Sequence, residues 1–85
     1  MAHMDQSLAY LREILSNYTE NHNEGKKLFD KLKNHYRTAE DFAEHLDAGD
    51  ITFLNSILPE EIKYALDEKD EERAEQLNNV YEQLF

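Results

Sequence analysis

Length, composition and charge exclude several classes of protein at once. The chain has 85 residues, 40% of them hydrophobic and 33% charged, so it suits one small domain with a thin core. Two glycines, one proline and no cysteine argue against a turn-rich β-sandwich, a disulfide framework and a thiolate zinc site. The formal net charge of -10 repels nucleic acid and anionic membrane surfaces. We therefore expect a protein partner or self-association, with no nucleic acid and no membrane partner.

The ends of the chain and its apolar runs carry no sign of a targeting or spanning segment. Residues 1–4 resemble the remnant of an expression tag, and residues 5–85 are expected to form a single helical domain. The apolar runs are too short for a membrane span, and no basic stretch precedes an apolar run as in a secretory signal. Together with the absence of cysteine, this pattern predicts an intracellular protein.

The first apolar stripe has helical spacing. It predicts a helix that begins at Asp5 or Ser7, either of which could cap it, and that ends at about Asn21. The stripe consists of Leu8, Leu11, Ile14, Leu15 and Tyr18. Turn-forming residues, Gly25 among them, then fill positions 21–25, which predicts a reversal of the chain in this stretch.

Two further short helices are predicted between residues 28 and 49. A second apolar stripe runs from Leu28 to Tyr36. Thr38 precedes Asp41 by three residues, a spacing close to that of a capping box, and predicts the start of a third helix. This helix is expected to end where Gly49 adopts a left-handed conformation.

The last part of the chain holds the most apolar segment and a charged run. Asp50 is expected to cap a short helix over residues 51–58, the predicted centre of the core, and Pro59 should end it and begin the next helix. The charged run 67–73 favours a continuous last helix, with a break near Asp70 as the alternative. Helices with such short stripes must pack on one another. The sequence predicts an all-α fold, a small bundle of four to five helices with a long C-terminal helix.

Basic residues are concentrated in one segment of this acidic chain. Five of the nine lie between residues 26 and 37: Lys26, Lys27, Lys31, Lys33 and Arg37. They could form a docking patch for an acidic protein or for phosphates, or simply a solvated helix face. Residues 38–62 hold seven acidic residues and no Lys or Arg. Attraction between the two segments, within one chain or between two copies, would explain both without further function.

Large apolar residues near the chain end provide a second candidate surface for binding a protein. They are Tyr64, Tyr81, Leu84 and Phe85. The same residues could equally belong to the core.

Catalytic and metal-binding patterns have little support. Asp41 and His45 share a helix face and could form half of a metal site, but no second pair has comparable spacing, so a surface pair is favoured. The offsets of a calcium-binding EF-hand are missing, as are a nucleophile elbow and a phosphate-binding glycine loop. The sequence predicts no catalytic residue, no cofactor and no metal ion, and hence no enzyme.

A helix-turn-helix DNA-binding domain is a further alternative, because short helices between residues 26 and 58 could imitate its geometry. The segments that would enter the groove, 38–49 and 50–58, are acidic or apolar where DNA recognition requires Arg, Lys and Asn. Charge therefore argues against it.

Three segments resemble a known family. They are residues 10–17 (YLREILSN), residues 53–58 (FLNSIL) leading into 61–65 (EIKYA), and residues 73–82 (RAEQLNNVYE). In these segments the chain is similar to the sigma-G-dependent sporulation-specific acid-soluble spore protein family of Bacillus. The resemblance implies expression in the forespore and presence in the spore interior, and it implies no activity or cofactor. The abundant spore proteins that coat DNA are a different group.

The resemblance and the composition together suggest two functions. The leading hypothesis is a non-enzymatic protein-protein interaction module of the forespore or spore. The alternative is a structural or storage component of the spore that has no specific partner.

Overall fold

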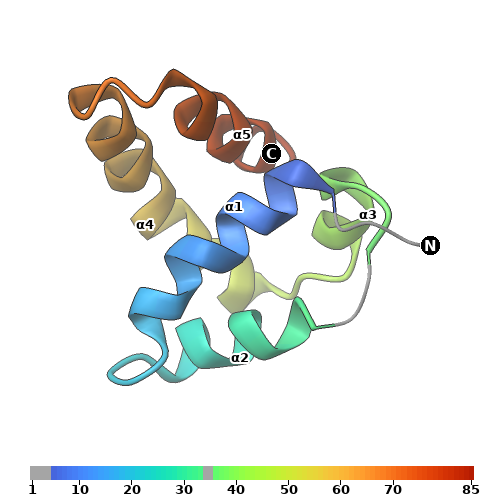
Figure 1. Cartoon of the computed structure of the whole chain (residues 1–85). Coiled ribbons are helices and arrows are strands. Elements are labelled where there is room, and N and C mark those ends of the chain that lie inside the picture. The colour runs from blue at the N-terminus through green and yellow to red at the C-terminus, as the bar shows by residue number, and fades with distance from the viewer. Residues whose placement is uncertain (1–4, 34–35) are drawn as a thin grey trace.

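The computed structural model describes residues 5–33 and 36–85, which form five α-helices and one 3-10 turn. The elements are α1 (Gln6–Leu15), the turn η1 (Ser16–Tyr18), α2 (Asn23–Lys31), α3 (Ala39–Glu44), α4 (Ala48–Asp67) and α5 (Glu71–Glu82). Helix α1 crosses the middle of the view in Figure 1, with α2 below it, α3 to the right, and α4 and α5 to the left and above. The predicted all-α class is confirmed. The predicted tag remnant, residues 1–4, lies outside the described residues.

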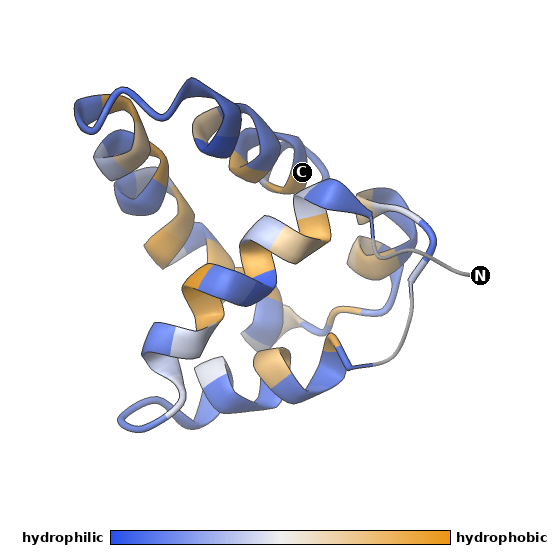
Figure 2. Ribbon diagram, in the orientation of Figure 1, coloured by the Kyte–Doolittle hydropathy of each residue, from blue (hydrophilic) through white to orange (hydrophobic). Residues whose placement is uncertain are grey.

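The core gathers apolar side chains from all five helices around α1. Figure 2 shows the hydrophobic bands of α1 and α4 and the largely hydrophilic loops. The side chains with no exposed surface include Leu8, Leu11 and Leu15 of α1, Leu28 of α2, Phe42 of α3, Leu54 and Leu58 of α4, and Leu77 and Val80 of α5. The segment that was expected to be the core centre is buried at Leu54, Ile57 and Leu58, while Phe53 is half-buried.

Gly25 lies inside a helix, so the predicted reversal in residues 21–25 is found slightly earlier in the chain and does not involve the glycine. Helix α2 begins at Asn23, and the reversal falls in residues 19–22, before it. No glycine among the described residues has a positive φ. Gly25 is buried, and a Cβ there would come 2.7 Å from the Cβ of Tyr18. The glycine is needed for close approach of α2 to η1, and not for backbone freedom.

The starts of α3 and α4 are fixed by side-chain caps. The hydroxyl of Thr38 accepts a hydrogen bond from the Asp41 amide at 3.0 Å, which confirms the predicted cap of α3. The prediction that Gly49 ends this helix is wrong, because α3 ends at Glu44 and Gly49 lies in the first turn of α4. Asp47, and not Asp50, caps α4. Each of these two aspartates accepts a hydrogen bond from the other's amide, which forms a complete capping box.

Helix α4 continues through Pro59, so the prediction that Pro59 ends one helix and begins another is also wrong. A proline inside a helix costs about 3 kcal/mol, because it removes a hydrogen bond and crowds the preceding turn. Leu54 and Leu58 before the proline and Ala65 after it are all fully buried. The burial of α4 residues both before and after Pro59 outweighs the free-energy cost of the proline.

The helix is interrupted in the charged run 67–73. The favoured prediction of a continuous last helix is therefore wrong, and the alternative, a break near Asp70, is confirmed. The amide of Asp70 donates to the carbonyl of Ala65 at 2.8 Å, and that of Lys69 donates to Leu66 at 3.0 Å. With Lys69 at φ 60°, these bonds form a Schellman motif that ends α4. The Asp70 carboxylate then accepts from the Arg73 amide and caps α5. The turn folds α5 back onto α4 and α1, where Leu77 and Val80 complete the core.

Candidate functional site

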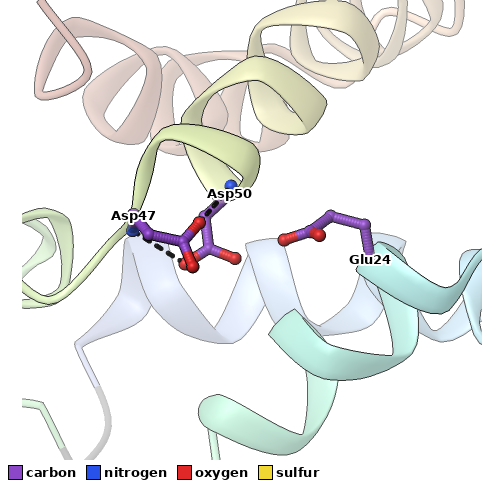
Figure 3. Close-up of side chains that lie close together, drawn as sticks. All are labelled: Glu24, Asp47 and Asp50. Atoms are coloured by element: carbon purple, nitrogen blue, oxygen red, sulfur yellow. Dashed lines mark hydrogen bonds between the residues drawn. The ribbon is translucent and has the colours of Figure 1, made fainter.

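A cluster of charged side chains along α2 contacts the first turn of α4. It consists of Glu24, Lys27 and Lys31 from α2, and of Asp47 and Asp50 from the start of α4. The three carboxylate groups contribute oxygen atoms that lie within 4.8 Å of one another. Figure 3 shows the Glu24 side chain reaching from α2 toward Asp50. We call these five residues the α2–α4 charge cluster.

The capping box places Asp50 at the centre of the α2–α4 charge cluster. Its side chain has no exposed surface, and its Oδ2 atom accepts from the Asp47 amide at 3.0 Å and from Lys31 Nζ at 3.2 Å. Lys31 also donates to the carbonyl of His45 at 2.7 Å. Lys27 Nζ lies 2.7 Å from Asp47 Oδ2 and 3.2 Å from Asp50 Oδ1. A buried carboxylate is costly without such partners, and here two ammonium groups balance it.

Two buried oxygen atoms of the cluster have no hydrogen-bond donor. They are Oε1 of Glu24 and Oδ1 of Asp50. Lys27 Nζ is 3.7 Å from Glu24 Oε1, which is too long for a hydrogen bond. Lys27 Nζ lies 3.2 Å from Asp50 Oδ1, as an ion pair without a hydrogen bond, so neither oxygen accepts a hydrogen bond as long as both carboxyl groups are ionised.

The environment shifts the acid-base properties of four groups. The carboxylates of Asp47 and Asp50 raise the pKa of Lys27, and the hydrogen bond from Lys27 lowers the pKa of Asp47. Burial acts to raise the pKa of Asp50, but the neighbouring Glu24 carboxyl group, the hydrogen bond from the Asp47 amide and the two lysine ammonium groups hold its pKa below the usual range. The proximity of Asp50, followed by burial, raises the pKa of Glu24.

The chemistry of the cluster matches that of an internal ion-pair network. Three carboxylates would suit a hard cation such as Ca²⁺ or Mg²⁺. However, Lys27 Nζ lies within 3.7 Å of an oxygen of each of them and already supplies a positive charge. The sequence did not reveal this grouping because Glu24 is more than twenty residues from Asp47 along the chain. The only local signals are the Asp47/Asp50 capping spacing and the Glu24/Lys27 spacing.

Two of the five predicted basic residues contact acidic residues at the start of α4. Lys27 and Lys31 turn toward the acidic start of α4, which confirms the interpretation of attraction within the chain for these two. Lys33 is exposed and lies 3.4 Å from Asp30. Lys26 and Arg37 are exposed as well.

The four C-terminal candidates divide into two kinds. Tyr64 and Phe85 are 56% and 85% exposed, whereas Tyr81 and Leu84 are half-buried and pack against the core. The rings of Tyr81 and Phe85 meet edge-on, with centroids 5.1 Å apart. Leu66, which the sequence reasoning missed, is 55% exposed. It lies two residues from Tyr64 in the last turns of α4, and no pattern in the sequence separates it from the buried leucines.

The Asp41/His45 pair has the geometry of a surface contact. His45 Nδ1 lies 2.8 Å from the carbonyl oxygen of Asp41 and 4.0 Å from its carboxylate. Both side chains are open to solvent, at 36% and 56% exposure. No third ligand joins them among the described residues.

Comparisons with known proteins cover nearly the whole chain. A family model with the description "CsgA: Minor curli fiber component A" matches residues 4–85. The "Sigma-G-dependent sporulation-specific SASP protein" of Bacillus subtilis (strain 168) is 46% identical over 82 residues, which are 96% of this chain and 100% of that protein. No solved structure matches significantly.

The two names point to different settings, a spore and a fibre. The described part of the chain is helical and contains no β-strand, and none of its helices is both long and apolar enough to cross a membrane. The name of the B. subtilis relative agrees with the family resemblance seen in the three sequence segments, which is thereby confirmed. The chain belongs to the family of the sigma-G-dependent sporulation-specific SASP protein, the family whose model is described as minor curli fiber component A.

Proposed function

We propose that this protein is a non-enzymatic interaction module of the forespore or spore, which binds another protein through apolar side chains in the last turns of α4. The observation that carries the proposal is the exposure of Tyr64 and Leu66, at 56% and 55%. The large apolar residues of the core cluster are buried or half-buried. Burial of Tyr64 and Leu66 by a partner would recover hydrophobic free energy that the isolated chain leaves unused.

The surroundings of these two side chains support an interface. Exposed charged residues flank them on α4 and in the following turn: Lys63, Asp67, Glu68 and Lys69. An apolar centre with a charged rim is the usual composition of a protein-protein interface. The net charge of -10 favours a basic or neutral partner. Phe85, also exposed, lies against Tyr81 and could extend the contact.

Membership of the family supports the proposed biological setting, the forespore or spore. The B. subtilis relative is named for sporulation, and its name describes a spore protein and no reaction. This supports a spore-associated role without catalysis for the present chain.

Site-specific photo-cross-linking in sporulating cells tests the proposal. A photoreactive phenylalanine analogue replaces Tyr64 in one strain and Asn55, an exposed residue on the opposite face of the same helix, in a control strain. We expect one discrete cross-linked species from position 64, lost when Leu66→Ser is added, and none from position 55. Sedimentation of the purified protein shows whether the partner is a second copy.

Two results would contradict the interaction module. Equal cross-linking from positions 55 and 64, on opposite faces of the helix, would indicate non-specific contact. No cross-linking from position 64, in a strain where the protein accumulates normally, would favour the structural or storage component.

A further inference from the structure

The charge balance of the α2–α4 charge cluster is incomplete when all its groups have their ordinary charges. Three carboxylates face two ammonium groups, which leaves one negative charge in excess. Asp47 is 59% exposed and its charge is solvated, but the Asp50 side chain has no contact with solvent and Glu24, at 31% exposure, turns a buried oxygen toward it. Excess charge in such a place is expensive, and a bound proton would remove it.

The two oxygens without a donor show where a proton would lie. Glu24 Oε1 and Asp50 Oδ1 are both buried acceptors without a hydrogen bond. The Glu24 side chain points across the gap between the helices toward Asp50 (Figure 3). One proton on Glu24 would turn an acceptor into a donor and satisfy both groups, in the way that paired carboxyl groups of other proteins share a proton.

We infer that Glu24 keeps a proton in the folded protein and uses it to donate a hydrogen bond to the ionised Asp50, so that the stability of the contact between α2 and α4 depends on pH. The charged groups that face Glu24 are Lys27 on its own helix and Asp47 and Asp50 on α4, with Lys31 on the far side of Asp50. Lys27 favours the ionised form of Glu24, but its ammonium is closer to both aspartates than to Glu24. The inference concerns the stability of the fold and is independent of the proposed partner surface.

The direction of the pH dependence follows from linkage. A carboxyl group whose pKa is higher in the folded than in the unfolded chain stabilises the fold most at low pH. That contribution is complete below the unfolded pKa of about 4.3 for a glutamate and is lost as pH rises through the folded pKa. Most carboxylates in ion pairs have the opposite dependence, as Asp50 does in this cluster.

The variant Glu24→Gln tests the inference, because the glutamine amide is a permanent neutral donor. Unfolding constants of the natural chain and the variant are measured by urea titration from pH 4 to pH 9. We expect the unfolding constant of the natural chain, divided by that of the variant, to be constant below the unfolded pKa. Above it the ratio should rise by up to tenfold per pH unit, as the natural chain loses stability, and then level off. The matched control Glu75→Gln, at an exposed position of α5, should not show the rise that Glu24→Gln shows.

Other results would contradict the inference that Glu24 is protonated in the folded protein. If the natural chain gains stability relative to Glu24→Gln as pH rises through the ordinary glutamate range, Glu24 is ionised and paired with Lys27. If Mg²⁺ or Ca²⁺ raises the melting temperature of the natural chain at pH 8, and a chelator abolishes the rise while Glu24→Gln shows none, a cation and not a proton completes the cluster. Should Glu24→Gln fail to fold, NMR titration of the Glu24 carboxyl carbon in the natural chain decides, since a midpoint at or below the ordinary glutamate value refutes the inference.

Discussion

Gly25 of α2 lies directly against the backbone of Tyr18 in η1. A Cβ atom on Gly25 would lie 2.7 Å from the Cβ of Tyr18 and closer still to its carbonyl oxygen. The obstacle includes backbone, which cannot move aside as the end of a flexible side chain can. Only a residue without a side chain therefore allows the first turn of α2 to pack against η1.

Gly25→Ala should destabilise the protein by about 1–3 kcal/mol, the usual cost of overpacking, even though alanine is the better helix former. Urea unfolding measures the change. Gly49→Ala is the matched control, because Gly49 is also in a first helical turn and a Cβ there would meet only side-chain atoms at 3.4 Å or more. The control should be neutral or stabilising by up to about 1 kcal/mol. Equal losses in both variants would show that helix starts in general, and not the contact with Tyr18, cause the effect.

The presence of helices was predictable from the sequence, but several of the residues at which they begin and end were not. Apolar spacing and the Thr38 cap are local features, so the sequence shows them directly. Gly25 and Pro59 are usual signals for turns and helix ends, yet both lie inside helices. What overrides them is tertiary: close approach to Tyr18 in one case, and burial on both sides of the proline in the other. Such contacts between distant segments leave no trace in a local pattern.

Leu54→Ala should cost about 2–5 kcal/mol, the range for a buried leucine, which is a large share of the stability of a domain this small. Leu54 has no exposed surface, so the removed methyl groups leave a cavity in the core. Thermal and urea unfolding followed by circular dichroism measure the loss. Thr52→Ala, at an exposed position of the same helix, should change the stability by less than about 1 kcal/mol. An unchanged melting curve for Leu54→Ala would contradict the core described above.

Lys31→Met should destabilise the fold by about 1.5–3 kcal/mol, the value of a hydrogen bond to a charged group, because it takes a donor from the buried Asp50 and from the His45 carbonyl. Sequence reasoning alone predicts little cost at this position, since a lysine on a basic helix face is usually solvated. Lys26→Met is the control, because Lys26 lies on the same helix and is exposed. If both variants unfold at the same urea concentration, the contact between Lys31 and Asp50 contributes nothing to stability.

The charge cluster was hidden from sequence reasoning for a different reason than the helix boundaries. Each half of it is visible locally, as a lysine pair four residues apart and as two aspartates at capping spacing. Their meeting depends on how α2 packs against the start of α4, which apolar periodicity does not determine. The exposure of Leu66 was unpredictable in the same way, since a leucine in an apolar helix is expected to be buried.

Duplex DNA should not bind with sub-micromolar affinity at physiological salt. The net charge is -10, and two of the five clustered basic residues, Lys27 and Lys31, already pair with aspartates. Fluorescence anisotropy with labelled duplexes of mixed sequence checks this at two salt concentrations. A tight complex that weakens steeply with added salt would reveal a phosphate-binding face formed by the remaining basic residues.

The stability of the protein should fall in strongly alkaline solution through one identifiable group. The Tyr18 hydroxyl donates to Glu61 Oε2 at 2.7 Å, and burial, this hydrogen bond and the charge of Glu60 raise the pKa of Tyr18 to about 12. Because the folded pKa is above the unfolded value of about 10, the contribution of Tyr18 to the free energy of unfolding is complete below pH 10 and is lost as pH rises from 10 to 12.

Phenolate absorbance at 295 nm should show a late ionisation step near pH 12 that Tyr18→Phe removes and that Tyr64→Phe, at an exposed position, retains. In urea unfolding, the stability advantage of the natural chain over Tyr18→Phe should shrink across the same interval. A constant advantage from pH 9 to pH 12, or a late step that survives Tyr18→Phe, would show that the bond to Glu61 does not hold the Tyr18 proton.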